Sequence, residues 1–224
     1  MKKWLSYGIM CVLTPAAALL GARLFGERRA AWLSLCVTIL ACIPFFLHFE
    51  RKQMSTRRLI LVAVMIALSV VGRMLFAPIP GFKPVTALSI ITAMYFGPEA
   101  GFMTGALTAV ISNFYFGQGL WTPFQMFCWG MIGLIAGLFA NPLKKSRVAL
   151  VIFGVLSGIL LSFLLDIWTV LWADSVFTFR RYLVAITAAA RFTATYAVSN
   201  VIFLLLFARP IGKILDRIKL KYDL

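Results

Sequence analysis

The sequence predicts an all-α membrane protein, because its apolar content is too high for a soluble domain and its apolar residues fall into long runs. Of the 224 residues, 62% are hydrophobic and only 13% are charged, and the mean hydropathy is +0.95. A soluble domain must cover itself with polar side chains, whereas a membrane helix needs about 20 mostly apolar residues in succession. We therefore expect lipid to surround most of the fold.

Eight apolar runs are candidate membrane helices, at about 4–22, 30–48, 59–77, 84–98, 99–115, 121–141, 148–172 and 182–208. The shorter runs can span only where other helices shelter them. A charged linker from Glu50 to Arg58 separates the first two runs from the rest. The sequence thus predicts a two-helix leader with a basic linker over 1–56, a six-helix core over 57–209, and a basic tail over 210–224. A cleavable signal peptide is the alternative interpretation of the first run.

Basic residues in short loops are retained on the cytoplasmic side, which orients the chain. With the amino terminus inside, fourteen Lys and Arg residues fall on inner segments and six on outer loops. Both termini are therefore predicted to be cytoplasmic, in a multi-pass protein of the bacterial cell membrane. The charge of +15 is scattered between apolar runs rather than gathered in one stripe, so a nucleic-acid partner is not expected.

The tail after Pro210 has apolar residues at helical spacing among lysines and arginines. This pattern predicts an amphipathic helix on the inner leaflet, with a solvated basic tail as the alternative.

The sequence contains no recognisable catalytic or metal-binding motif. The only histidine, His48, has no HExxH motif or serine partner, and there is neither a P-loop nor a GxGxxG motif. The four cysteines lie in apolar runs without metal-ligand spacing. We therefore expect neither an enzyme nor a bound metal or cofactor, and any active uptake must draw its energy from another protein.

Three charged residues, Arg73, Asp166 and Arg191, fall inside predicted membrane helices, all in the outer half. Buried charges in a membrane are costly, so each is a functional candidate that needs a partner. Asp166 and Arg191 lie at similar depth on consecutive antiparallel helices, which predicts a salt bridge between them. This pair would belong either to a binding site or to the architecture alone.

The outer loops add aromatic, amide and basic residues at the same level. Three prolines stiffen the loop from Ala77 to Pro84. The side chains expected to join the three charges are Phe82, Lys83, Asn113, Gln118, Trp121, Gln125, Trp129 and Trp172, with Trp168 close by. Tryptophans alone would suit an interfacial belt, but with amides and charges they predict a pocket for a small molecule captured from outside.

Small residues one turn apart let membrane helices approach closely. They occur at Gly97, Gly101 and Gly105, at Gly133 and Gly137, and at Gly154 and Gly158, where we expect internal helix packing. The pair Ala63 and Ala67 begins the core and is expected to face a partner protein instead.

Several segments of the core resemble the substrate-binding S components of energy-coupling factor (ECF) transporters. They are the AxxxA element from Ala63 to Ala67, the segment Gly97-Pro-Glu-Ala-Gly101 and the segment Trp121-Thr-Pro-Phe-Gln125. The resemblance covers about residues 57–220, and the two-helix leader departs from the usual six-helix pattern.

This resemblance implies a division of labour among subunits. The S component would bind a vitamin from outside, dock through Ala63 and Ala67 on a transmembrane T component that carries two ATPases, and release the vitamin inside. Similarity to eight-helix members of the family implies cobalamin as the vitamin. The alternative is a structural or assembly membrane protein without any small-molecule ligand.

Overall fold

The computed structural model of the protein describes residues 39–40, 42–43, 55–174 and 177–222, which form helices joined by loops, with no strand among them. The predicted two-helix leader lies almost entirely outside the described residues. The described helices are α3 (Thr56–Leu75), α4 (Val85–Phe96), α5 (Pro98–Phe116), α6 (Thr122–Leu138), α7 (Ala140–Lys145), α8 (Arg147–Asp174), α9 (Phe179–Ala188) and α10 (Ala190–Tyr222). The all-α prediction is confirmed.

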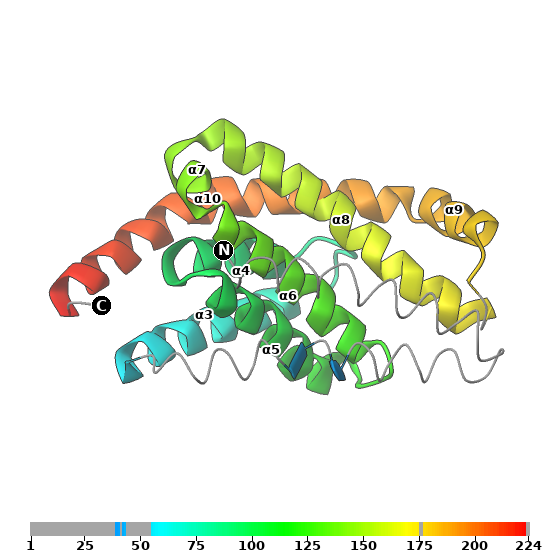
Figure 1. The fold of residues 1–224 in the computed structure, drawn as a ribbon, viewed down its shortest axis with the longest axis horizontal. Helices are drawn as coiled ribbons and strands as arrows, with labels where there is room; N and C mark the ends of the chain where they lie inside the picture. The colour runs from blue at the N-terminus through cyan, green and yellow to red at the C-terminus, as the bar shows by residue number, and fades with distance from the viewer. Residues whose placement is uncertain (1–38, 41, 44–54, 175–176, 223–224) are drawn as a thin grey trace.

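Helix α4 is the centre of the bundle, with α3, α5, α6 and α10 packed around it (Figure 1). Nearly all of its side chains are buried, and they are apolar or small on every face. A helix that is apolar all round is stable only when other helices cover it. At 12 residues α4 is too short to cross a bilayer alone. The neighbouring helices shelter it, as expected for the shorter apolar runs.

Glycine at position 97 separates α4 from α5. Its backbone has a φ of 96°, a conformation that residues with a side chain rarely adopt. Pro98 then occupies the first turn of α5, where its missing N–H costs nothing. The predicted division between the runs 84–98 and 99–115 is thus confirmed to within two residues.

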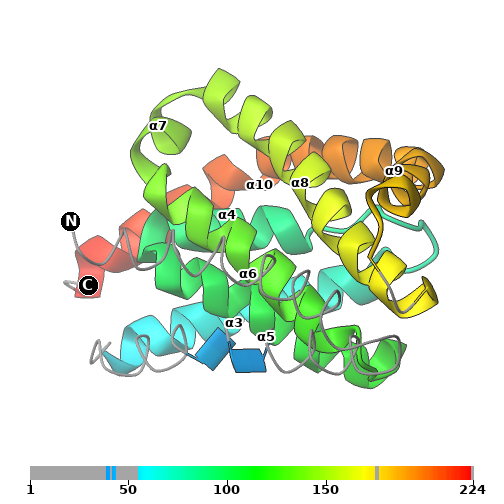
Figure 2. The ribbon, with the colours of Figure 1, turned by 45° about the vertical axis from the view of Figure 1, so that its right-hand side comes forward.

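Glycine contacts hold α5 against α6 and α8 against α10, as the small-residue pattern predicts. A Cβ at Gly101 would lie 2.7 Å from the Gly133 carbonyl oxygen, and one at Gly105 would lie 2.5 Å from the Trp129 backbone. On the other pair of helices, a Cβ at Gly158 would lie 2.5 Å from the Ala197 nitrogen. Backbones this close exclude any larger residue. Figure 2 shows α5 and α6 running together beneath α8 and α10.

Three of the described helices, α3, α8 and α10, are long and apolar enough to cross a membrane, and α4 and α6 are shorter apolar helices. Together with α5 they correspond to the six predicted runs of the core. The short helices α7 and α9 were not predicted as separate elements; α7 lies between α6 and α8, and α9 precedes α10 (Figure 1).

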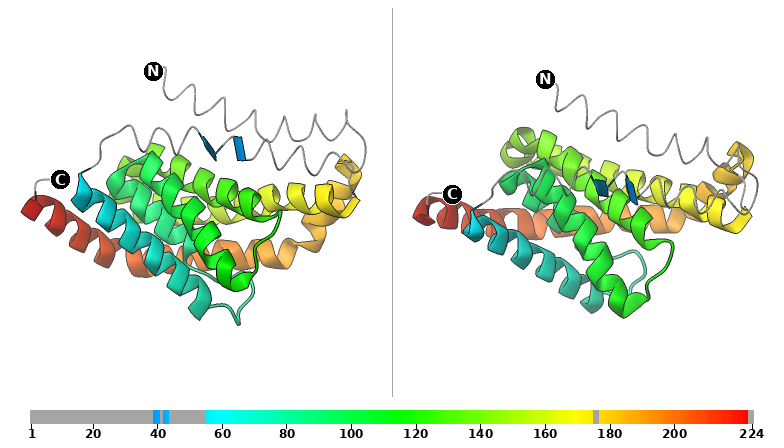
Figure 3. Two further views of the ribbon diagram at one scale, coloured as in Figure 1. Left: turned by 90° about the horizontal axis from the view of Figure 1, so that it is seen from below. Right: turned by 60° about the horizontal axis from the view of Figure 1, so that its bottom comes forward.

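The last predicted run, 182–208, is corrected at both ends. Its first part is the separate helix α9, which Thr178 caps by accepting a hydrogen bond from the Arg181 N–H and which ends at Ala188. Its last part does not stop before Pro210, because α10 continues to Tyr222 (Figure 3). Gly212 and Leu215 beyond the proline are buried in the bundle, so packing holds the helix together where a backbone hydrogen bond is missing. The tail is therefore a continuation of α10, and its position on the inner leaflet stays a prediction.

A candidate substrate pocket at the outer end

A pocket of about 310 Å³ opens where α6 begins, α8 nears its end and α10 begins. This end of the bundle is the one predicted to face outward. Four aromatic and four polar side chains line this outer pocket, namely Trp121, Trp168, Phe192 and Tyr196, and Gln125, Ser162, Asp166 and Thr169. Of the predicted site residues, Trp121, Gln125 and Asp166 meet here.

Trp168 gives the outer pocket a fixed flat wall. Its ring lies 4.3 Å from the ring of Phe124 on one side and stacks at 5.5 Å with Trp172, with an interplanar angle of 28°. Trp168 is buried, whereas Trp172 is exposed and supports it without lining the pocket. Trp168 is thus held rigidly by its neighbours, whereas Trp121, 40% exposed at the pocket, keeps ring surface free for a flat aromatic ligand.

Asp166 supplies the pocket with an unpaired acceptor. Its side chain is 7% exposed, and its Oδ2 atom has no hydrogen-bond partner. Buried carboxylates are normally paired or hydrogen-bonded, because removing a charge from water costs several kcal/mol. An unpaired carboxylate that lines a cavity is therefore placed to accept a hydrogen bond from a ligand.

The predicted salt bridge between Asp166 and Arg191 does not form among the described residues. Arg191 is exposed, whereas Phe192 and Tyr196, one turn apart, line the pocket. Thr193 faces α8, where its hydroxyl donates a 2.7 Å hydrogen bond to Ser162. Arg191 lies two residues before Thr193, which is about 200° around the helix, so its side chain points away from α8. The sequence predicted that Asp166 and Arg191 lie at equal depth in the membrane, but it did not predict the direction in which Arg191 points around its helix.

Behind the pocket, Arg73 is buried in a network of neutral groups. Its Nη1 donates to the Ser112 hydroxyl and, at 2.8 Å, to Asn113 Oδ1. The Asn113 amide in turn donates at 2.9 Å to Thr122 Oγ1 and to Gln125 Oε1. Within the described residues no carboxylate forms an ion pair with Arg73. The network therefore orients Gln125, which lines the pocket, while leaving a net positive charge behind it.

Trp129 lies between two cations. The Arg73 guanidinium is 4.9 Å and the Lys83 ammonium 5.2 Å from its ring, and the side chain is 1% exposed. Lys83 also lies 5.3 Å from the ring of Tyr196, which lines the pocket. Cation–π contacts of this kind offset part of the cost of burying a charge. Trp129 therefore sits beneath the pocket and fixes the cations instead of lining it.

The remaining predicted residues have other surroundings. Phe82 packs in an aromatic cluster, 5.5 Å from Phe76 and 4.9 Å from Phe203, and anchors the proline-rich loop. Gln118 is exposed and accepts a 3.0 Å hydrogen bond from Thr122, so it meets the network from the α5–α6 loop. Neither residue lines the outer pocket.

Sequence reasoning missed Tyr196, Phe124 and Ser199. Ser199 is buried and holds the loop, accepting a 2.9 Å hydrogen bond from the Lys83 N–H and donating to the Lys83 carbonyl. Tyr196 and Ser199 are one turn apart on a polar stripe of α10 that also carries Asn200. This stripe is the sequence feature from which both residues could have been predicted. Asn200 donates to Gly154 O and Ser157 Oγ on α8.

Comparison with known families decides what kind of protein carries this pocket. A sequence model of the family described as ECF-type riboflavin transporter, S component, matches residues 53–217. The chain belongs to this family. No curated protein and no solved structure matches it.

Membership in the family confirms that the protein is an S component, the membrane subunit that binds substrate for an ECF transporter, and not an enzyme. It also disfavours the alternative of a structural membrane protein without a ligand. Cobalamin receives no support, because the matching family is named for riboflavin. In the described part of the S component, no group of three or more His, Cys, Asp or Glu side chains is placed to hold a metal.

Lys83 should make the stability of the S component depend on pH. It lies in the α3–α4 loop, where burial and then the nearby Arg73 cation lower the pKa of its ammonium to about 7 from 10.5. Between these two values the unfolded chain binds more protons than the folded one, so stability rises with pH. We expect the Tm in detergent to rise more between about pH 7 and pH 9 for the wild type than for Lys83→Met.

The control is Lys145→Met, which removes a lysine whose side chain is exposed. This variant should keep the full wild-type rise in Tm. Identical pH profiles for Lys83→Met and wild type would contradict the buried position of the Lys83 ammonium.

Proposed function

We propose that this S component captures riboflavin, or a closely related flavin, in the outer pocket and delivers it across a bacterial plasma membrane. The observation that carries the proposal is the unpaired Asp166 carboxylate in a pocket walled by aromatic rings. The name of the matching family makes riboflavin the first candidate.

The chemistry of a flavin matches the lining of the pocket. The isoalloxazine ring system is flat and aromatic, and one edge carries an N–H group between two carbonyl groups. The partly exposed ring of Trp121 offers a surface for stacking, the Gln125 amide can donate to a carbonyl, and Asp166 Oδ2 can accept from an N–H. The Arg73 cation behind the pocket would further favour a flavin, because the carbonyl oxygens of the oxidised isoalloxazine carry partial negative charge.

The size of the pocket supports a flavin over a corrinoid. Ligand pockets range over roughly 300–1,000 Å³, and the outer pocket lies at the small end with about 310 Å³. A corrinoid carries a macrocycle and a nucleotide loop and is several times larger than a flavin. The aromatic rings close to the mouth would have to separate to admit it.

We further propose that α3 docks on a T component that is driven by two ATPases. One face of α3 packs into the core through Val62, Met65 and Ile66, whereas Ala63 and Ala67 are exposed on the other. Small residues one turn apart allow a partner helix to approach the α3 backbone closely. Exposed apolar side chains such as Val71 extend this face and would be covered by the partner or by lipid.

Titration of the purified S component with riboflavin tests the proposed substrate. Stacking on an aromatic side chain of the pocket should quench the flavin fluorescence, so we expect saturable quenching with one flavin bound per chain. Cobalamin in the same assay should neither bind nor compete. Absence of quenching, together with a different small molecule retained by the purified protein, would overturn the assignment to flavins.

A further inference from the structure

We propose that a second pocket, at the opposite end of the bundle, binds a phosphate group, carried either by an anionic phospholipid or by free phosphate. This inner pocket has a volume of about 270 Å³ and lies between the end of α4, the start of α8 and the second half of α10. The proposal is independent of the flavin assignment, since the two pockets share no residue.

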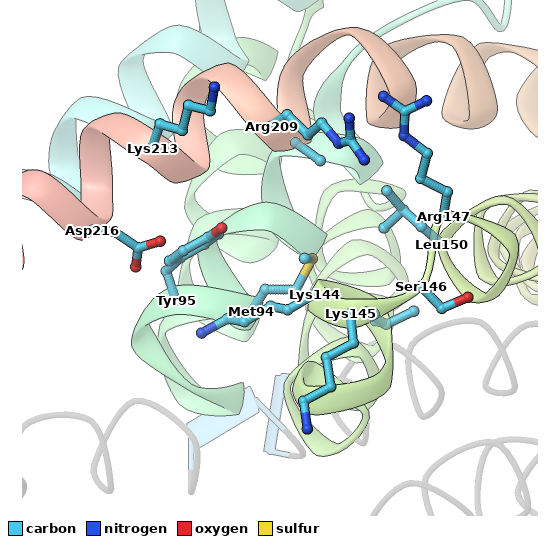
Figure 4. Close-up of a pocket in the computed structure, with 12 residues that line it drawn as sticks. Met94, Tyr95, Lys144, Lys145, Ser146, Arg147, Leu150, Arg209, Lys213 and Asp216 are labelled. Carbon is cyan, nitrogen blue, oxygen red and sulfur yellow. The ribbon is translucent and has the colours of Figure 1, made fainter.

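The inner pocket carries a large excess of positive charge. Five of its lining residues are basic, Lys144, Lys145, Arg147, Arg209 and Lys213, and one is acidic, Asp216. Figure 4 shows Arg147 extending from the start of α8 toward Arg209 on α10, Lys213 further along α10, and the Asp216 carboxylate beside Tyr95. Cations from three helices, α7, α8 and α10, around one cavity repel one another, and a bound anion would relieve this repulsion.

Three of these cations are available to a ligand. In the part of the chain that the structure describes, Arg147, Arg209 and Lys213 form no ion pair and donate no hydrogen bond to a protein group, and all three are exposed at the rim. Lys144, by contrast, lies 4.4 Å from the ring of Tyr95, which already holds its ammonium. Guanidinium groups bind phosphate oxygens with two parallel hydrogen bonds, so Arg147 and Arg209 are the main candidates.

The start of α8 adds a favourable field. Ser146 caps this 28-residue helix, its hydroxyl accepting a 3.2 Å hydrogen bond from the Ala149 N–H, and Ser146 and Arg147 both line the pocket. The amino-terminal end of a helix carries a partial positive charge and free N–H groups, which together bind phosphate.

The floor of the pocket favours a lipid among the phosphate carriers. Met94, Leu143, Leu150 and Ala208 line it, and each is buried. A cavity with a cationic rim and an apolar floor matches an amphiphile better than a small ion. The sequence places this end of the bundle at the cytoplasmic face, where anionic head groups concentrate and basic pockets between membrane helices bind them.

The test uses the full chain, purified and stripped of lipid in a neutral detergent. It is titrated at constant ionic strength with short-chain phosphatidylglycerol, short-chain phosphatidylcholine and inorganic phosphate, and binding is measured as the rise in Tm. We expect a saturable rise with phosphatidylglycerol and little with zwitterionic phosphatidylcholine. An equal response to inorganic phosphate would identify the free ion as the source of the group.

The double variant Arg147→Gln/Arg209→Gln should weaken phosphatidylglycerol binding by at least about tenfold, because it removes two charge-assisted contacts. Arg217→Gln is the matched control, since Arg217 is an exposed arginine of α10 outside the pocket. Lys213→Gln provides a milder second variant if the double variant aggregates. The proposal is overturned if neither ligand raises the Tm, if Arg217→Gln weakens binding equally, or if only an acidic protein partner binds there.

Discussion

Replacing Asp166 by alanine is expected to weaken riboflavin binding by about 10- to 100-fold, because a hydrogen bond to a charged group contributes about 1.5–3 kcal/mol. The carboxylate is buried, lines the outer pocket, and has an oxygen without any partner in the protein. Fluorescence titration of the purified variants measures the effect. Asp166→Asn, which keeps the shape but loses the charge, should fall between alanine and the wild type.

Asp166→Ala should leave the stability of the apo protein unchanged or raise it. In the apo protein the Asp166 carboxylate bears the cost of burial without a salt bridge in return, and alanine removes that cost. A purely architectural role predicts the opposite, a loss of Tm with no change in affinity. Arg191→Ala is the matched control: this exposed arginine makes no ion pair with Asp166, so both affinity and Tm should stay at wild-type values. Equal losses of affinity for Asp166→Ala and Arg191→Ala would contradict the site.

The end of the bundle that carries the outer pocket could be predicted from sequence, because depth in a membrane follows from position along an apolar run. Gln125 and Asp166 do lie at the same end and on the same cavity. The partner of Asp166 could not be predicted in this way. Each residue turns a helix by about 100°, so an uncertain helix start leaves the facing side undetermined. The break at Ala189 therefore decided that Tyr196 rather than Arg191 faces the pocket.

The position of Trp129 shows a second limit of the sequence. Its spacing from Gln125, one turn along α6, correctly predicts that both belong to one face. Which of them reaches the cavity depends on how closely α5 approaches, and Gly105 brings the α5 backbone against Trp129 itself. Trp129 is thereby enclosed between Arg73 and Lys83, while Gln125 remains at the pocket surface. Residue spacing thus predicts the depth and the helix face of Gln125 and Trp129. Which of the two lines the cavity depends on the distance between α5 and α6, and the sequence does not give this distance.

The contact between α5 and α6 should be the least tolerant point of the fold. A Cβ at Gly133 would lie 2.3 Å from the carbonyl oxygen and 2.4 Å from the carbonyl carbon of Gly101. Both obstructing atoms belong to the backbone, so relief requires the two helices to move apart. Because overpacking a core costs about 1–3 kcal/mol, we expect Gly133→Ala to lose stability at the upper end of this range, even though alanine favours helix formation.

Gly154→Ala is the matched control on α8. The atoms nearest to its added Cβ are the Leu204 Cδ1 at 3.0 Å and the Val201 Cγ2 at 3.3 Å, both at the ends of side chains that can adjust. The reactivity of Cys128, a buried thiol of α6, reports unfolding directly in a background where the other three cysteines, Cys11, Cys36 and Cys42, are replaced. On heating in detergent, Cys128 should react at a clearly lower temperature in Gly133→Ala and at a nearly unchanged temperature in Gly154→Ala. Equal shifts in the two variants would mean that α5 and α6 can separate cheaply, and the close backbone contact beneath the outer pocket would then not hold Trp129 in place.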